Sequence, residues 1–154
     1  MKLKLTLIIF SLMLLSCGFK VVDQSYLKNI EISETNITGD KRIAYLLKNK
    51  LKTTSSDSSR SIKLNIGIKK IKQIKEKNIQ NEITKYEINI IADVKFDLVE
   101  KNKSEEFTVS KKNDYKVSSQ YSSTLNNEKN LVKDLIGEIA DDIIENLAIR
   151  VDDL

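Results

Sequence analysis

The sequence predicts an α+β fold: a two-layer sandwich in the order β-α-β-β-β-α, whose four-stranded, mostly antiparallel sheet carries two helices on one face. Two patterns indicate this fold. Apolar and polar residues alternate over residues 62–68 and 86–98, which is typical of strands with one buried face. Apolar residues recur every three or four positions over residues 41–52 and 126–148, as on amphipathic helices. Because each element has a single apolar side, we expect the helices to cover the apolar side of the sheet.

The chain begins with a predicted secretory signal, residues 1–16. Lys2 and Lys4 precede an apolar run over residues 5–15, and a run of this length is typical of a signal peptide. The other interpretation is an uncleaved membrane anchor. The run is short for that, because a helix needs about 20 apolar residues to span a bilayer.

Cys17 is the predicted lipidation site. The residues Leu14-Leu15-Ser16-Cys17 resemble the lipobox of bacterial lipoproteins, where a peptidase cuts before the cysteine and the thiol carries a diacylglycerol. A lone cysteine could instead be a nucleophile, but the sequence has no histidine to activate it. By the sorting rule of those lipoproteins, Gly18 after the cysteine favours the outer membrane.

The length of the remaining chain suits one domain. We expect residues 17–25 to form a tether from the membrane, residues 26–150 the domain, and residues 151–154 an acidic tail. The chain has 26 basic and 22 acidic side chains, a net charge of +4. This balance reflects abundant lysine and does not indicate nucleic-acid binding.

The first elements are a short strand and a helix. Alternating β-branched residues predict a strand over residues 26–32, followed by a turn over residues 35–39. Asp40 is the predicted N-cap of a helix over residues 41–52, because a carboxylate can accept hydrogen bonds from the first helical N–H groups. A polar, Ser-rich surface loop is expected over residues 53–60.

Two strands and a hairpin tip follow. The alternation over residues 62–68 slips at Lys70-Ile71, which predicts a bulge or a change of strand direction there. A polar hairpin tip is expected over residues 75–81. The third strand, residues 86–98, has seven apolar residues in phase and is longer than the usual five or six residues.

The fourth strand and the last helix complete the predicted domain. A second hairpin tip over residues 101–105 leads to a strand over residues 107–117. Lys111 and Asn113 interrupt its apolar face, so we expect this strand to bend or to reach into solvent. The C-terminal helix is expected over residues 126–148. Three aromatic side chains are expected in the core: Tyr45, Tyr86 and Phe96.

Four stretches follow one another along the chain: Cys17-Gly18-Phe19, Arg42 to Leu47, Lys85-Tyr86-Glu87-Ile88, and Asn127 to Leu135. Their ordered combination resembles LptE, the lipopolysaccharide-assembly lipoprotein family. The resemblance implies a plug for the large β-barrel LptD that assists its assembly. Together the two deliver lipopolysaccharide to the outer leaflet of the outer membrane. The resemblance also implies a lipid-anchored protein on the periplasmic side of that membrane or in the barrel lumen.

Lys75, Lys77, Lys111 and Lys112 are the candidate contacts with lipopolysaccharide or with the barrel. The resemblance implies basic residues near the tip between strands two and three and on the following strand. A lysine ammonium can bind phosphate as a point charge. The alternative is a solvated, lysine-rich hairpin without such a role.

Enzyme activity, a metal and a separate cofactor are not expected. The chain has no histidine, and the Ser-rich stretch 55–61 has no patterned base to activate a hydroxyl. No spacing of acidic residues fits a known metal loop. The covalent lipid on Cys17 is the single attached group that the sequence predicts. The alternative function is a periplasm-facing lipoprotein that binds lipid or peptide on its own.

Overall fold

The computed structural model describes residues 30–52 and 60–152. The predicted signal over residues 1–16, Cys17 and the tether up to residue 25 lie outside the described residues.

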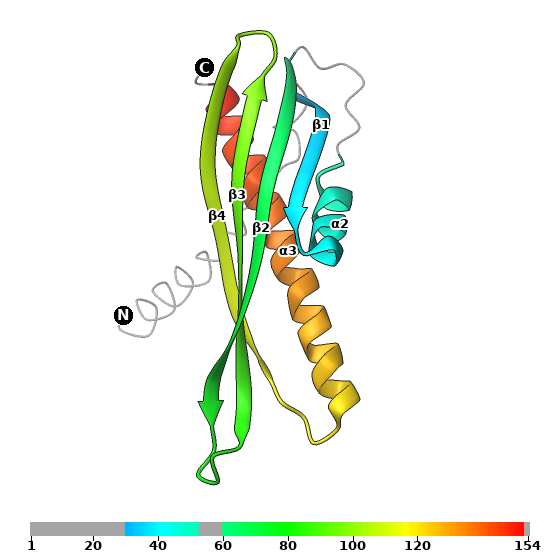
Figure 1. Ribbon diagram of the computed structural model, residues 1–154, viewed down its shortest axis with the longest axis vertical. Coiled ribbons are helices and arrows are strands. Elements are labelled where there is room, and N and C mark those ends of the chain that lie inside the picture. Colours follow the sequence, from blue (N-terminus) through cyan, green and yellow to red (C-terminus); the bar gives the residue numbers. More distant parts are fainter. Residues whose placement is uncertain (1–29, 53–59, 153–154) are drawn as a thin grey trace, which may run out of the picture.

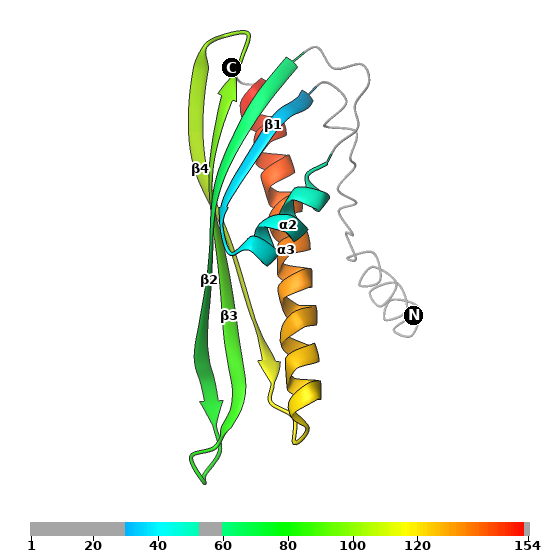
Figure 2. The same ribbon diagram turned by 45° about the vertical axis from the view of Figure 1, so that its right-hand side comes forward.

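The described chain forms one four-stranded sheet and two helices, which confirms the predicted α+β class. The elements are β1 (Ile30–Gly39), α2 (Lys41–Lys50), β2 (Arg60–Lys77), β3 (Ile83–Leu98), β4 (Lys103–Lys116) and α3 (Tyr121–Asp152). Strands lie in the order β1-β2-β3-β4; β1 pairs with β2 in parallel, and the other neighbours are antiparallel. Both helices lie on one face of the sheet (Figure 1, Figure 2).

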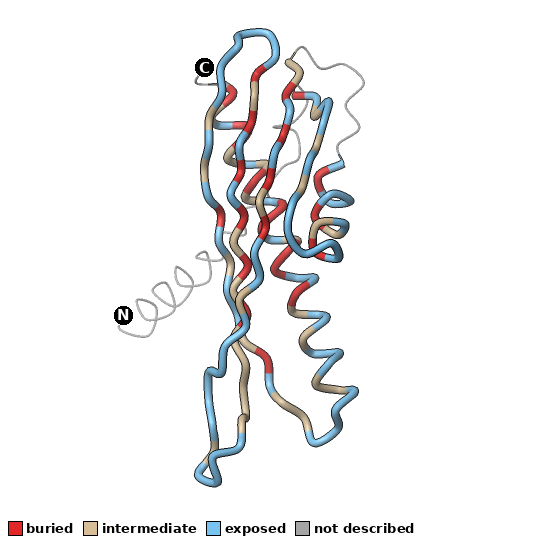
Figure 3. Tube along the Cα trace, viewed as in Figure 1, coloured by how far each residue is buried: buried red, intermediate tan, exposed pale blue. Residues whose placement is uncertain are grey.

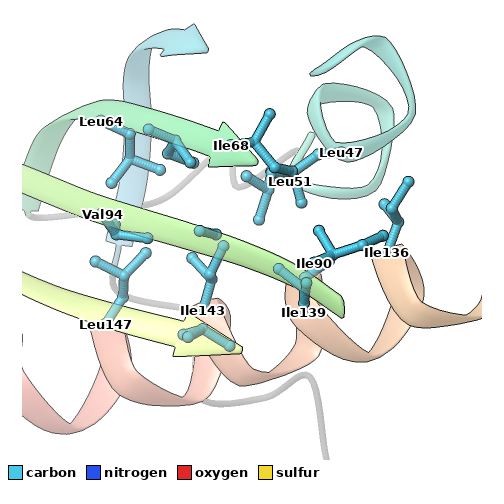
Figure 4. Close-up of a cluster of buried hydrophobic side chains, with 14 of the residues drawn as sticks. Leu47, Leu51, Leu64, Ile68, Ile90, Val94, Ile136, Ile139, Ile143 and Leu147 are labelled. Carbon is cyan, nitrogen blue, oxygen red and sulfur yellow. The ribbon is translucent and has the colours of Figure 1, made fainter. Parts of the chain in front are cut away.

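The core lies between the helices and the upper part of the sheet. From Ile88 onward every second residue of β3 is buried, as its alternation predicts: Ile88, Ile90, Ala92, Val94, Phe96 and Leu98. Figure 4 shows side chains of α2 and α3, among them Leu47 and Ile139, converging on side chains of β2 and β3. Burial of this apolar surface is the main source of stability in a domain of this size.

The predicted turn over residues 35–39 is wrong, because β1 continues through it to Gly39. A register shift between Ile32 and Glu34 changes which residues face the helices, so that Ile37 is packed against the core. Parallel pairing with β2 therefore overrides the turn-forming residues. The chain reverses at Gly39, whose φ of 117° disfavours any residue with a side chain.

The predicted irregularity at Lys70-Ile71 is also wrong. The β2–β3 pairing runs without a break from Ile62 to Ile74, and its register shifts only between Ile74 and Lys77. The period of two continues, but the next two inward positions after Ile68 are Lys70 and Lys72. At this point β2 extends beyond the core. The change from apolar to basic residues at its inward positions looks, in the sequence, like a slip of the alternation.

Helix α3 is longer at both ends than its apolar stripe predicts. It begins at Tyr121, because the exposed first turns carry no periodic signal. It ends at Asp152, so the predicted tail over residues 151–154 is helical in its first two residues. Val151 is buried, and its carbonyl accepts a hydrogen bond of 2.8 Å from Nη1 of Arg60. Arg60 thus supplies a partner for a carbonyl that a helix end leaves unpaired.

Tyr45 is the one predicted aromatic core residue that lies at the surface, with 67% of its area exposed. Ile43, Leu47 and Leu51 face the sheet and fix the rotation of α2. Tyr45 then falls on the opposite side of the helix. Phe96 is fully buried, and Tyr86 is half-buried against the core.

Candidate contact surface

The hairpin of β2 and β3 extends beyond the core at one end of the molecule (Figure 1, Figure 3). None of the residues from Lys69 to Lys77 is buried. Ile74 is 50% exposed, and Ile79 at the hairpin tip is fully exposed. This projecting part of the hairpin holds most of the lysine run seen in the sequence.

Local hydrogen bonds hold the hairpin tip in one conformation. The side-chain oxygen of Asn78 accepts from the backbone N–H of Gln80 at 3.0 Å and of Glu82 at 2.9 Å. Asn81 adopts a φ of 63°, in the left-handed region that asparagine tolerates better than most residues. Lys77 Nζ donates to Asn81 Oδ1 at 2.9 Å, so its ammonium lies at the tip without a carboxylate partner in the described chain.

Lys75 lies on the outer face of the sheet, which we define as the face opposite the helices. Its Nζ is 2.8 Å from Asp114 Oδ1 and 3.5 Å from Glu87 Oε2. The hydrogen bond to Asp114 raises the pKa of Lys75, and the same bond lowers the pKa of Asp114. The charge of this candidate lysine is therefore largely compensated.

Lys111 and Lys112 are neighbours on β4 and point to opposite faces. Lys111 faces the helices, where its Nζ lies 2.8 Å from Asp142 Oδ2 of α3, and this hydrogen bond raises the pKa of Lys111. Lys112 is exposed on the outer face and forms no ion pair within residues 30–52 and 60–152. The pairing of β4 with β3 is continuous, so Lys111 leaves the register intact.

The structure therefore does not gather the four candidate lysines into one site. Lys75 and Lys112 share the outer face, Lys77 lies at the hairpin tip, and Lys111 faces α3.

A cluster around Glu128 was not predicted as a unit. Glu128 of α3 accepts hydrogen bonds from Lys72 at 2.7 Å, Lys70 at 3.3 Å and the hydroxyl of Tyr115 at 2.8 Å. Lys72 Nζ also lies 4.2 Å from the ring centroid of Tyr86, within reach of a cation–π contact. The Tyr86 and Tyr115 rings are stacked at 5.8 Å. These five residues, which we call the Glu128 cluster, join the hairpin to α3 just below the core.

The charge of Glu128 is strongly stabilised within this cluster. Burial by itself would raise the pKa of the carboxyl group, but hydrogen bonds from Lys72, Tyr115 and Lys70 lower it to about 2. Burial by itself would lower the pKa of Lys72, but the hydrogen bonds and charge interactions with Glu128 and Tyr115 together raise it. Lys70 and Lys72 continue the alternation of the buried Ile68 and therefore lie on the same face of β2. This spacing was the signal in the sequence that could have revealed their contact with Glu128.

The outer face is lined by polar side chains that pair across strands. Thr108 donates to Asp93 at 2.7 Å, Ser110 to Asn89 at 2.9 Å, and Gln73 to Glu87 at 2.6 Å. These pairs are exposed, and such groups can exchange partners with water or with another protein. Within residues 30–52 and 60–152 no group of side chains is arranged to hold a metal ion. No helix in that part of the chain has both the length and the apolar character needed to cross a membrane.

No family model matches the sequence, and no curated protein matches it. Several solved structures share the fold. Rare lipoprotein B from Shewanella oneidensis is similar with a TM-score of 0.61 and 15% identity, covering 78% of this chain and 97% of that one. A minor lipoprotein from Acinetobacter baumannii has a TM-score of 0.52 and 13% identity, covering 80% of this chain and 92% of that one. Lipoprotein B from Nitrosomonas europaea has a TM-score of 0.52 and 13% identity, covering 82% of this chain and 88% of that one. At these identities the likeness shows the fold, and the three similar proteins are lipoproteins.

Proposed function

We propose that this chain is an outer-membrane lipoprotein of the LptE type. It would plug the β-barrel LptD, assist its assembly and deliver lipopolysaccharide with it to the outer leaflet. The observation that carries the proposal is the agreement between the ordered sequence resemblance and the fold, which is shared with rare lipoprotein B. Rare lipoprotein B and LptE are the same family.

The distribution of polar side chains supports a plug. The lumen of a large outer-membrane barrel is polar and filled with water, so a protein inside it needs an outer surface that forms hydrogen bonds. The described core is closed between the helices and the sheet, and the outer face carries paired hydroxyl, amide and carboxylate groups. A binding protein acting on its own would need an apolar pocket between the layers, where this chain has packed side chains.

The membrane anchor in this proposal is the lipid on Cys17. Several acyl chains give stable attachment, because each buried methylene group contributes about 0.8 kcal/mol. Gly18 after the cysteine favours the outer membrane. We also propose that the protein is not an enzyme, since the whole sequence lacks histidine.

Two of the four candidate lysines are better placed than the others to bind a phosphate. Lys75 and Lys111 each face a carboxylate at 2.8 Å, which a phosphate would have to displace. Lys77 is held by the neutral amide of Asn81, and Lys112 has no ion pair in the described chain. Lys77 and Lys112 are therefore the proposed contacts with lipopolysaccharide phosphates.

Co-purification tests this function. A tagged chain recovered from detergent-solubilised outer membrane should bring down a large β-barrel in a one-to-one ratio, and mass spectrometry should find acyl chains on Cys17. Recovery of the tagged chain as a free monomer would contradict the plug. The double variant Lys77→Gln/Lys112→Gln should keep the barrel and weaken lipopolysaccharide binding. Lys75→Gln/Lys111→Gln is the matched control for charge.

A further inference from the structure

Helix α2 carries charges of one sign. No acidic residue occurs between positions 41 and 52. The basic residues of this segment are all exposed: Lys41, Arg42, Lys48, Lys50 and Lys52. We call them the α2 cations.

The α2 cations are unpaired, unlike many basic residues of the sheet. Lys63, Lys85 and Lys111 each have a carboxylate oxygen within 3.4, 2.6 and 2.8 Å. Among the described residues, none of the α2 cations forms an ion pair or a side-chain hydrogen bond. The carboxylate next to them, Asp40, accepts instead from the backbone N–H groups of Arg42 and Ile43 at 2.9 and 3.1 Å.

Helix stability explains only some of these charges. Lysines in the last turn interact favourably with the negative end of the helix dipole, which accounts for Lys48 and Lys50. Lys41 and Arg42 lie in the first turn, where the dipole disfavours cations. Their presence therefore calls for a different reason.

Part of this charge lies on one side of α2. Lys41, Tyr45 and Lys48 follow one another at spacings of four and three residues, so they share one stripe of the helix, and Lys52 comes directly after the C-cap Leu51. The opposite stripe is buried in the core. Tyr45 stands exposed among the cations, and an aromatic ring with a polar end is favoured at a membrane–water interface. Figure 2 shows α2 beside β1, on the helix side of the sheet.

We propose that the α2 cations and Tyr45 dock on the anionic phospholipid surface of the membrane that holds the protein. Lysine predominates in the set, and its ammonium is a compact point charge that can bind the phosphates of lipid headgroups. Each basic residue near an anionic bilayer contributes about a fivefold gain in binding. The inference rests on the lipid anchor of the proposed function. Cys17 and Ile30 are 13 positions apart in the sequence and lie at most about 45 Å from each other, which keeps the domain close to the bilayer.

A fluorescent label on α2 tests the contact in the acylated full-length protein. Asn49→Cys places a new thiol at an exposed position of α2, while the acylated Cys17 does not react. The protein is inserted into nanodiscs of phosphatidylcholine, alone or mixed with phosphatidylglycerol. We expect a blue shift and quenching by lipid-borne quenchers only in the anionic discs, and their loss in high salt. A label at Glu138→Cys on α3 should show no blue shift and no quenching in either kind of nanodisc.

Charge variants identify the residues responsible. Lys41→Gln/Lys48→Gln/Lys52→Gln should lower the ratio of contacting to free populations about a hundredfold. Lys69→Gln/Lys95→Gln/Lys103→Gln removes the same charge from the sheet and should leave the label signal unchanged. Equal signals in neutral and anionic discs would overturn the inference. A signal that requires the barrel would also overturn it, since an acidic protein wall would then be the partner.

The outcomes separate this inference from the proposed function. Chains that respond to anionic lipid but co-purify without a barrel would refute the plug and retain the docking surface. Mass spectrometry of the same sample shows whether Cys17 is acylated. An unacylated chain would contradict the anchor, and flotation with anionic against neutral vesicles would then decide whether α2 still binds lipid.

Discussion

Glu128 connects two parts of the molecule that share few core contacts. The hairpin beyond Ile68 has no buried residue on β2, and the first turns of α3 are largely exposed. The Glu128 carboxylate lies between them, with Lys70 and Lys72 on one side and Tyr115 beside it. A partly buried charge is costly without partners, so removal of the carboxylate should leave two lysines insufficiently compensated.

The first prediction concerns Glu128→Gln. We expect this variant to lose about 2 kcal/mol of unfolding free energy at neutral pH. The folded pKa of Glu128 is about 2, against 4.5 without these contacts, so its contribution is complete above pH 4.5 and falls as the pH approaches 2. The difference between wild type and variant should therefore shrink in acid. Urea unfolding followed by circular dichroism at a series of pH values measures it.

Glu106→Gln is the control for this prediction. Glu106 is exposed on β4 and has no ion pair in the described chain, so its variant should stay within about 0.5 kcal/mol of wild type at every pH. If the two variants gave the same pH dependence, the Glu128 cluster would not be a source of stability.

Two glycines give a second prediction with opposite signs. A Cβ on Gly39 would collide with the backbone carbonyl of Ile68, and its φ of 117° is strained for any other residue. Gly137 lies within α3 and has open space around it. We expect Gly39→Ala to lose about 3 kcal/mol of unfolding free energy and Gly137→Ala to gain about 0.5–1 kcal/mol. Urea unfolding measures both, and a stable Gly39→Ala protein would show that β1 ends differently.

At the scale of elements, the sequence was informative where burial set the pattern. β3 and the central part of α3 were predicted from their periodicity, because each packs one face on the core along its length. The end of β1 and the first turns of α3 were missed. The end of β1 depends on its parallel pairing with β2. The start of α3 depends on polar contacts, such as the 2.9 Å hydrogen bond from the Ser118 N–H to Thr124. Neither leaves a periodic apolar pattern in the sequence.

The candidate site shows the same division. The sequence identified the lysines, but their partners come from distant segments: Lys75 from Asp114, and Lys111 from Asp142. Which lysines keep an uncompensated charge is decided by strand register and by the rotation of α3. Neither quantity can be read from a lysine run.

The third prediction concerns the start of α2. Asp40 Oδ1 accepts from two backbone N–H groups that a helix otherwise leaves without partners. Asp40→Ala should therefore lower the unfolding free energy by about 1 kcal/mol, whereas Asp40→Asn should lose only a few tenths. Urea unfolding of both variants checks this. Equal losses would mean that the charge of Asp40, rather than its cap, stabilises α2.

The whole molecule divides its stability and its exposed contacts between two ends. The upper part holds the core, in which α2, α3 and all four strands contribute buried residues. The lower part is the projecting hairpin, fixed by the Glu128 cluster and by the hydrogen bonds of Asn78. A rigid, exposed tip at the end of a stable body is suited to reach a partner, and the body can tolerate changes in it.

The last prediction separates these two roles with a pair of variants. Ile143 of α3 is fully buried, so Ile143→Ala should cost about 2–5 kcal/mol of unfolding free energy through lost burial and a cavity. Ile79 is fully exposed at the tip, so Ile79→Ser should change stability by less than about 0.5 kcal/mol. If the hairpin reaches the barrel or its lipid, Ile79→Ser should nevertheless reduce barrel co-purification or bound lipopolysaccharide. Urea unfolding and recovery from solubilised membranes measure the two effects on the same samples. Wild-type recovery of both partners with Ile79→Ser would show that the tip faces only water, and contact would then have to come from the outer face.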